Sequence, residues 1–194
     1  MTIASEICES GPLRQPTAAD PAEAELVRAS VAGEARAFDA LVQLHGNRVF
    51  NYIHQMTRQA QDAEDLAQQT FIKAYEHLHR VDTSRPLIGW LLTIARRTAL
   101  NHFRAACRWE PVAEDLPTTE RSPAQLAEDR DRVSDLWAHA RRVLGPREYE
   151  VLWLRFAENL SVAETARVVG LTQTHVKILV FRARHTLMKL PFTP

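Results

Sequence analysis

Residues 160–190 read LSVAETARVVGLTQTHVKILVFRARHTLMKL, and this stretch decides the fold of the carboxy-terminal part of the chain. Ser161 and Glu164 have the Ser-x-x-Glu spacing of a capping box, in which a hydroxyl and a carboxylate bind two free amides at a helix start. Such a cap is worth about 1 kcal/mol. Apolar residues then follow at helical spacing as far as Gly170, the residue type best suited to the left-handed backbone of a helix end. The pattern predicts a helix that begins at Ser161 and stops at Gly170.

A second helix is predicted directly after this one, with Thr172 as its cap. Its apolar face consists of Val176, Leu179, Val180, Ala183, Leu187 and Leu190. Its other face is polar and basic, and consists of Gln173, Thr174, His175, Lys177, Arg182 and Arg184. No carboxylate follows Glu164. Two helices joined by a Gly-containing turn form a helix-turn-helix, whose second helix can enter the major groove of DNA. Any small helical hairpin with a solvated basic face has the same pattern, so the rest of the chain must decide.

The overall charge hides a strong segregation along the chain. The 194 residues have a formal net charge of zero, which by itself argues against a nucleic-acid-binding protein. However, the segment from Arg85 to Arg108 has five arginines and no carboxylate, whereas Glu110 to Asp131 has seven carboxylates. A basic block therefore precedes an acidic one.

Cysteine usage and hydropathy exclude several classes of protein. The two cysteines, Cys8 and Cys107, have no metal-ligand spacing, so we expect no disulfide framework, no metal site and no cofactor. The amino terminus lacks the pattern of a signal peptide. The longest mostly apolar run, Leu87 to Ala95, is about half a membrane span, so we expect no membrane insertion and a cytoplasmic location.

Composition divides the chain into an all-α protein with two small helical domains. We expect a disordered tail over residues 1–21, a first helical domain over 22–107, a linker over 108–130 and a second helical domain over 131–191. The linker is acidic and contains three prolines, which suits an extended conformation. In the first domain we expect an initial pair of helices that Gly46 softens or interrupts. In the second, Leu144 to Glu148 is typical of a helix stop followed by a new start.

The predicted helix from Asp62 to Leu78 has an apolar face over four turns and an acidic side at its start. That side consists of Asp62, Glu64, Asp65, Gln68 and Gln69. Acids in a first turn complement the helix dipole, so ordinary helix electrostatics explain them as well as a partner-binding surface does.

The predicted helix from Trp90 to Arg108 has a stripe of basic and amide side chains. The members of the stripe recur at positions i, i+4, i+7 and i+11, and they are Arg97, Asn101, Arg104 and Arg108. Arg96 lies beside the stripe. One rigid helix of this kind can lay several guanidinium groups along a phosphate backbone, while an amide pairs with a base edge. A merely solvated arginine face is the alternative.

Residues 81–89 form a predicted loop that contains Thr83, Ser84 and Arg85 and leads into Trp90. Small polar groups beside a cation and an aromatic ring could hold an unstacked base. A tryptophan is, however, more often a core residue than a stacking platform.

Four motifs in the same order strongly resemble the extracytoplasmic-function (ECF) sigma factors of bacteria, members of the sigma-70 family. They are residues 62–71 (DAEDLAQQTF), 90–97 (WLLTIARR) and 144–148 (LGPRE), and the helix-turn-helix with Val176-Lys177 and Arg182-Ala-Arg184. The resemblance covers residues 22–190, and four ordered motifs are far more specific than a single helix-turn-helix. It implies a sigma-two helical bundle and a sigma-four helix-turn-helix domain.

The resemblance also implies functions and partners. By it, the helix with Asp62, Asp65, Gln68 and Gln69 docks on core RNA polymerase, and polymerase supplies the catalysis. The arginine stripe and the 81–89 loop would recognise and open the minus-ten promoter element. Residues 173–184 would recognise the minus-thirty-five element as duplex, and an anti-sigma factor is a further implied partner. Two weak DNA-binding modules on one tether gain affinity through effective concentration.

The chain departs from the family pattern at two places. Family members usually have Asn and Asp where this chain has Arg97 and Asn101, which affects the preference at the minus-ten element. In the second helix of the helix-turn-helix, the usual Ser-Arg is Ile178-Leu179. Ile178 and Phe181 lie near the outward side, where they could touch thymine methyl groups or pack on another protein. Our hypothesis is that the minus-thirty-five sequence is atypical.

Two other classes of protein fit the sequence less well. A free-standing helix-turn-helix regulator, similar to response-regulator output domains, leaves residues 22–108 unexplained. An enzyme of the di-iron bundle class would use the Glu76-x-x-His79 spacing. That site needs a second Glu-x-x-His and two more carboxylates, and the chain has only this one such pair, so we expect a non-enzymatic protein.

Overall fold

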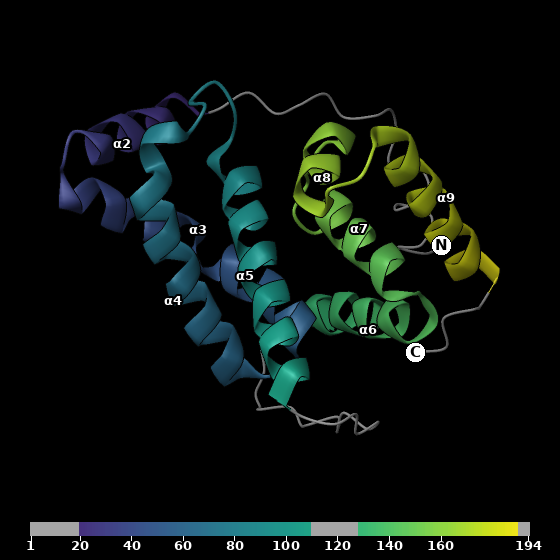
Figure 1. Cartoon of the computed structure of the whole chain (residues 1–194). Helices are drawn as coiled ribbons and strands as arrows, with labels where there is room; N and C mark the ends of the chain where they lie inside the picture. The colour runs from purple at the N-terminus through teal and green to yellow at the C-terminus, as the bar shows by residue number, and fades with distance from the viewer. Residues whose placement is uncertain (1–19, 110–127, 190–194) are drawn as a thin grey trace.

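The computed structural model describes residues 20–109 and 128–189, with the side chains of residues 106–109 and 128–134 left out. Its helices are α2 (Pro21–Val31), α3 (Ala35–Thr57), α4 (Ala60–His77), the 3₁₀ turn η1 (Leu78–Arg80), α5 (Leu87–Trp109), α6 (Glu128–Val143), α7 (Pro146–Phe156), α8 (Val162–Val169) and α9 (Gln173–Lys189). No strand occurs in these two ranges, which confirms the all-α prediction. Helices α2–α5, the amino-terminal domain, lie on one side, and α6–α9, the carboxy-terminal domain, on the other (Figure 1). Most of the predicted tail (1–21) and of the predicted linker (108–130) lies outside the described residues. Their edges differ from the prediction, because α2 begins at Pro21, α5 continues to Trp109 and α6 begins at Glu128.

The amino-terminal domain is a bundle in which α3 packs against α2, α4 and α5. Its core includes Leu41, Val49 and Ile53 of α3 together with Leu66 of α4 and Leu91 of α5. The expected break at Gly46 is wrong, because α3 runs through this position as one helix. Both turns around Gly46 carry buried side chains, so tertiary packing outweighs the roughly 1 kcal/mol that a helical glycine costs.

The start of α5 also differs from the prediction. The helix begins at Leu87 instead of Trp90, so the loop before it is shorter than the predicted 81–89 segment. Leu87 and Ile88 are buried in the core, and Pro86, which has its φ preset for a helix start, precedes them. Burial of this first turn extends the helix toward the amino terminus.

The predicted helix boundaries of the helix-turn-helix are confirmed. The Ser161 hydroxyl accepts a hydrogen bond from the Glu164 amide at 3.2 Å, and the Glu164 carboxylate accepts one from the Ser161 amide at 2.7 Å. Helix α8 ends at Gly170, which has a left-handed φ of 71°. The Thr172 hydroxyl accepts from the His175 amide and so caps α9. Helix α9 then packs on α7 and α8.

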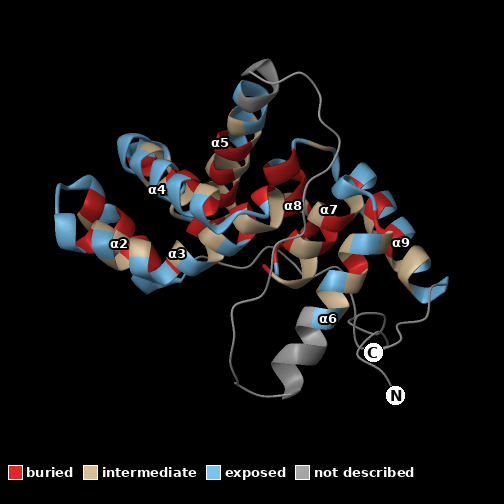
Figure 2. Cartoon of the chain, turned by 90° about the horizontal axis from the view of Figure 1, so that it is seen from below, coloured by how far each residue is buried: buried red, intermediate tan, exposed pale blue. Residues whose placement is uncertain are grey.

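The two domains share one hydrophobic core. Helix α5 packs against α8, and the buried side chains of Leu91 and Leu92 belong to the same cluster as Val151, Leu154 and Val169. Figure 2 shows buried positions, in red, on α5, α7 and α8 where the two domains meet. The described domains therefore adopt a closed arrangement.

None of the described helices combines the length and the apolar character that a membrane crossing requires.

Candidate nucleic-acid interface

The first candidate surface is the outward side of α9. The positions predicted for minus-thirty-five binding are exposed, with the exception of Arg184, which is half-buried; the exposed ones are Thr172, Gln173, Thr174, His175, Lys177, Ile178, Phe181 and Arg182. Leu179, by contrast, is buried in the core beside Val176. Of the two residues that replace the family's Ser-Arg, only Ile178 therefore faces outward.

The second candidate surface is the arginine stripe of α5. Arg97, Asn101 and Arg104 are exposed along one face of the helix. The Arg104 guanidinium donates a hydrogen bond of 3.3 Å to the Asn101 side-chain oxygen, which orders two neighbouring members of the stripe. The side chain of Arg108, the fourth predicted member, lies outside the described residues.

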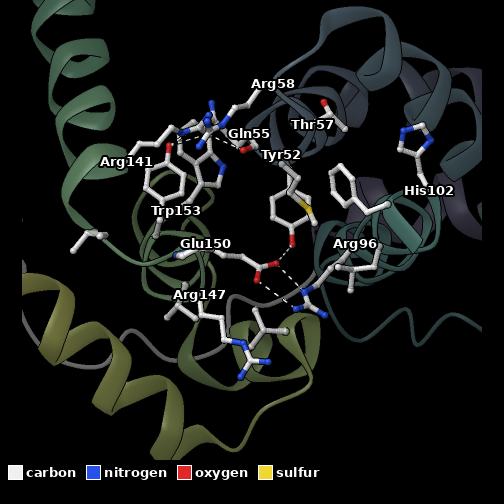
Figure 3. Close-up of a pocket in the computed structure, with 18 of the residues that line it drawn as sticks. Tyr52, Gln55, Thr57, Arg58, Arg96, His102, Arg141, Arg147, Glu150 and Trp153 are labelled. Carbon is white, nitrogen blue, oxygen red and sulfur yellow. Dashed lines mark hydrogen bonds and ion pairs between the residues drawn. The ribbon is translucent and has the colours of Figure 1, made fainter. Parts of the chain in front are cut away.

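Arg96 does not join this stripe. Its guanidinium points toward α7 and pairs with the Glu150 carboxylate at 2.8 Å between Nε and Oε1 (Figure 3). Burial lowers the pKa of Arg96, but the hydrogen bond and the charge of Glu150 outweigh this and raise it. Arg96, which was predicted to bind the minus-ten element, is thus engaged by the other domain in this arrangement.

The loop before α5 is organised around Asp82. The carboxylate of Asp82 accepts hydrogen bonds from the Ser84 amide at 3.0 Å and from the Ser84 hydroxyl at 2.5 Å, and it pairs with Arg85 at 3.1 Å. The two hydrogen bonds from Ser84, with a smaller contribution from the Arg85 charge, lower the pKa of Asp82. Of residues 82–85, Asp82, Ser84 and Arg85 are exposed and Thr83 is half-buried, so the turn presents a preformed polar edge.

Trp90 occupies an intermediate position between core and surface. Its side chain is half-buried and packs against the shared core, one turn into α5. The structure therefore gives the indole a packing role and leaves part of the residue exposed.

The third candidate surface is the acidic side of α4. Glu64, Asp65, Gln68 and Gln69 are exposed, whereas Asp62 is half-buried and its carboxylate lies 3.7 Å from the His102 ring on α5. The five predicted positions thus divide into four that face outward and one that contacts a neighbouring helix.

Sequence reasoning missed a polar network that joins the domains. The Tyr52 hydroxyl donates to Glu150 at 2.7 Å, and Arg48 pairs with Glu158 at 2.9 Å. The Arg141 guanidinium donates to the Gln55 backbone and side chain and lies over the Tyr149 ring. Tyr52, Gln55, Arg141 and Glu150 line a cleft of about 980 Å³ between the domains, and Figure 3 shows these four side chains. In the sequence, only the helical spacing of positions 48, 52 and 55 could have indicated that these polar side chains share one face of α3.

The Glu76-x-x-His79 spacing, considered above for a di-iron site, falls at the end of α4 and in η1. The His79 ring accepts a hydrogen bond from Arg80, and residues 20–109 and 128–189 contain no cluster of three potential metal ligands.

The folds of the two domains, with a helix-turn-helix in one and an arginine-lined helix in the other, define a two-domain DNA-binding protein. Models of two protein families match the same two parts of the chain: Sigma-70 region 2 at residues 41–108 and Sigma-70 region 4 at residues 142–189. The match to region 2 accounts for the segment that a free-standing regulator leaves unexplained, so that alternative is not favoured.

Relatives are similar over most of the chain. The ECF sigma factor BldN of Streptomyces coelicolor is 37% identical over 86% of the chain, which spans 64% of the length of BldN. The sigma-H factor of Pseudomonas aeruginosa is 32% identical, and the matched part covers 85% of this chain and 91% of that protein. The ECF sigma factor SigL of Mycobacterium tuberculosis is 30% identical, with 86% and 98% covered. The chain therefore belongs to the ECF family of RNA polymerase sigma factors.

Solved structures agree with the fold. CnrH, in complex with the cytosolic domain of CnrY, is 26% identical with a TM-score of 0.61, and the match covers 87% of this chain and 96% of CnrH. The sigma factor RpoE of Bartonella quintana, solved with the anti-sigma factor NepR, has a TM-score of 0.63 at 21% identity, with 80% and 96% covered.

Proposed function

We propose that this sigma factor binds core RNA polymerase through α4 and promoter DNA through α5 and α9. The observation that supports this division is the charge of the three exposed faces. Glu64 and Asp65 make the α4 face acidic, whereas α5 and α9 present arginine and lysine side chains without a carboxylate on either helix. Phosphate backbones attract the two basic faces and repel the acidic one, which leaves α4 for a protein partner.

The minus-ten element would be bound by the amino-terminal domain. Arg97 and Arg104 are exposed and would meet phosphates. Asn101, which accepts a hydrogen bond from Arg104, lies between them at a spacing that suits a base edge. The Asp82 turn and the open side of Trp90 would hold an unstacked base. Arg96 would contribute only after its pair with Glu150 has opened.

The minus-thirty-five element would be bound as duplex by α9. Residues at the start of the helix, Gln173 and Thr174, are polar and exposed, as expected for contacts with base edges. Simultaneous binding of both elements requires the two domains to separate, because the α5–α8 contact holds them together in the closed arrangement.

Membership of the family supports a proposal for the regulation and the location of the protein. CnrH was solved with the cytosolic domain of another protein, which supports a protein partner for this chain as well. We propose that this partner is an anti-sigma factor, that the protein acts in the cytoplasm with RNA polymerase, and that catalysis belongs to the polymerase alone.

Association with core RNA polymerase tests the proposal. The full chain, mixed with bacterial core polymerase, should co-migrate with it in size-exclusion chromatography. A variant with Glu64→Lys and Asp65→Lys should fail to co-migrate, because both reversed charges lie on the exposed α4 face. Asp39→Lys, at an exposed acid of α3, is the matched control and should bind normally. Equal binding by all three proteins, or by none, would contradict the proposal.

A further inference from the structure

The outward line of α9 is apolar at its centre. Ile178 is 43% exposed and Phe181 is 71% exposed, although both are large hydrophobic side chains. At about 3.6 residues per turn, positions 174, 178, 181 and 185 fall on one side of the helix. The buried residues Val176, Leu179 and Ala183 lie on the opposite side. The apolar pair therefore occupies the part of α9 that projects farthest from the domain.

This pair, which we call the apolar ridge (Ile178 and Phe181), has a defined shape. Residues three apart on a helix are neighbours, so the two side chains form a continuous surface. The His185 ring stacks on the Phe181 ring, with a centroid distance of 6.2 Å and an interplanar angle of 6°. This contact holds the phenyl ring along the helix, and the ridge is consequently preformed.

The charges around the ridge favour DNA over a protein as its partner. Cationic residues follow both edges of the outward face, with Lys177 and Arg184 on one edge and Arg182 and Lys189 on the other. Helix α9 has no carboxylate. The major groove has the complementary pattern: phosphates along both rims, and base edges on its floor that include the methyl groups of thymine.

We propose that Ile178 and Phe181 determine specificity at the minus-thirty-five element by packing against thymine methyl groups. This inference rests on the proposed function, because it assumes that α9 enters the major groove. A serine at position 178 would offer a hydrogen-bonding group there. Isoleucine instead offers only apolar contact, and the methyl group of thymine is the apolar feature of the groove floor. The ridge thus predicts required thymines opposite the second and third turns of α9.

Uracil substitution tests this inference, because deoxyuridine differs from thymidine only by the methyl group. Holoenzyme assembled from the full chain and core polymerase is first used to select a promoter from a randomised minus-thirty-five region. Each thymine of the selected duplex is then replaced by deoxyuridine in turn, and the dissociation constant is measured. We expect binding to weaken about fourfold at each thymine that the ridge contacts, the value for one buried methyl group.

Variants of the ridge identify the contact. For the Ile178→Ser variant, replacement of the thymine that Ile178 touches by deoxyuridine should change the dissociation constant less than twofold. For the wild type, the same replacement should weaken binding about fourfold. Phe181→Ser should remove the response at a neighbouring thymine. Leu44→Ser, at an exposed leucine of α3, is the matched control and should respond as the wild type does. Ile178 and Phe181 are exposed, so these changes leave the core intact.

The remaining outcomes separate this inference from the proposed function. A selected duplex that tolerates uracil at every thymine overturns the inference but leaves the sigma function in place. Tolerance of uracil at every thymine, combined with weaker association of the Ile178→Ser variant with core polymerase, shows that the ridge contacts protein. This outcome also overturns the inference. A chain that assembles no holoenzyme contradicts the proposed function, and the inference falls with it.

Discussion

Arg96 of α5 and Glu150 of α7 are joined by an ion pair of 2.8 Å that connects the two domains. Both side chains are largely buried, so the pair is screened less by solvent than a surface pair is. Arg96 immediately precedes the first member of the exposed arginine stripe. Under the proposed function, the contact that joins the two domains therefore also keeps Arg96 from reaching DNA.

Loss of the Glu150 charge should destabilise the closed protein. Glu150→Gln retains the shape and a hydrogen-bond acceptor for Tyr52, but it leaves the Arg96 charge without a counter-ion. We expect the free energy of unfolding to fall by about 1–3 kcal/mol, measured by urea denaturation. Glu76→Gln, at an exposed glutamate of α4, should change it by less than about 0.5 kcal/mol. Equal losses in the two variants would show that the ion pair is not stabilising.

Removal of Arg97 should weaken promoter binding without weakening the fold. Its side chain is exposed, so Arg97→Ala should delete the proposed phosphate contact without removing a core contact. The slope of log affinity against log salt should fall by about 1 for holoenzyme on promoter DNA. Arg36→Ala, at an exposed arginine of α3, is the control and should keep the wild-type slope. An unchanged slope for Arg97→Ala would exclude this phosphate contact.

Alkaline pH should destabilise the protein through Tyr52. Burial, with the nearby Glu150 charge adding to it, raises the pKa of this phenol well above its usual value of 10.0. In the unfolded chain Tyr52 loses its proton near its usual pKa, whereas the folded protein retains it. Stability that is fully present below pH 10 is therefore lost as the pH rises above this value.

Tyr52→Phe tests this pH dependence. The variant should be less stable at neutral pH by about 1 kcal/mol, because the hydrogen bond to Glu150 is lost. Its free energy of unfolding should, however, fall less steeply above pH 10 than that of the wild type. Tyr75→Phe, at an exposed tyrosine, should keep the wild-type slope. Parallel curves for all three proteins would contradict the prediction.

Two glycines should respond in opposite directions to alanine. Gly46 lies inside α3, and a Cβ atom there would meet nothing within 4 Å, so Gly46→Ala should stabilise the protein by about 0.5–1 kcal/mol. Gly170 has equal space but a φ of 71°, which an alanine adopts only with strain. Gly170→Ala should destabilise by about 1 kcal/mol. Thermal melting of both variants measures the difference, and shifts of the same sign would be inconsistent with this backbone argument.

Local patterns predicted much of the fold. The Ser161–Glu164 capping box and Gly170 defined both ends of α8, because caps depend on residues a few positions apart. The uninterrupted α3 and the early start of α5 were not predicted, since both depend on burial against other helices. Gly46 and Leu87 thus mark the places where tertiary packing overrides local propensity.

The outward faces were easier to predict than the contacts between domains. Exposed charges such as Arg97 and Asp65 follow directly from helical spacing. The orientation of Arg96 toward Glu150 does not follow from helical spacing, because the two residues are 54 positions apart. The spacing alone allows the Arg96 side chain to point either to solvent or to the other domain. Leu179 and Ile178 were predicted correctly, because helical spacing alone places Leu179 on the apolar face of the helix and Ile178 near its outward side.

Helix α3 contributes Arg48, Tyr52 and Gln55 to the carboxy-terminal domain while its neighbouring positions, Val49 and Ile53, lie among the apolar side chains of the shared core. Three polar contacts on one rigid rod cannot be released by degrees, because a slide of about 1.5 Å, one residue along the axis, misaligns all of them together. We therefore expect the three contacts to be lost together when the domains separate. Helix α3 thus couples the opening of its polar contacts to the exposure of the apolar residues Val49 and Ile53 beside them.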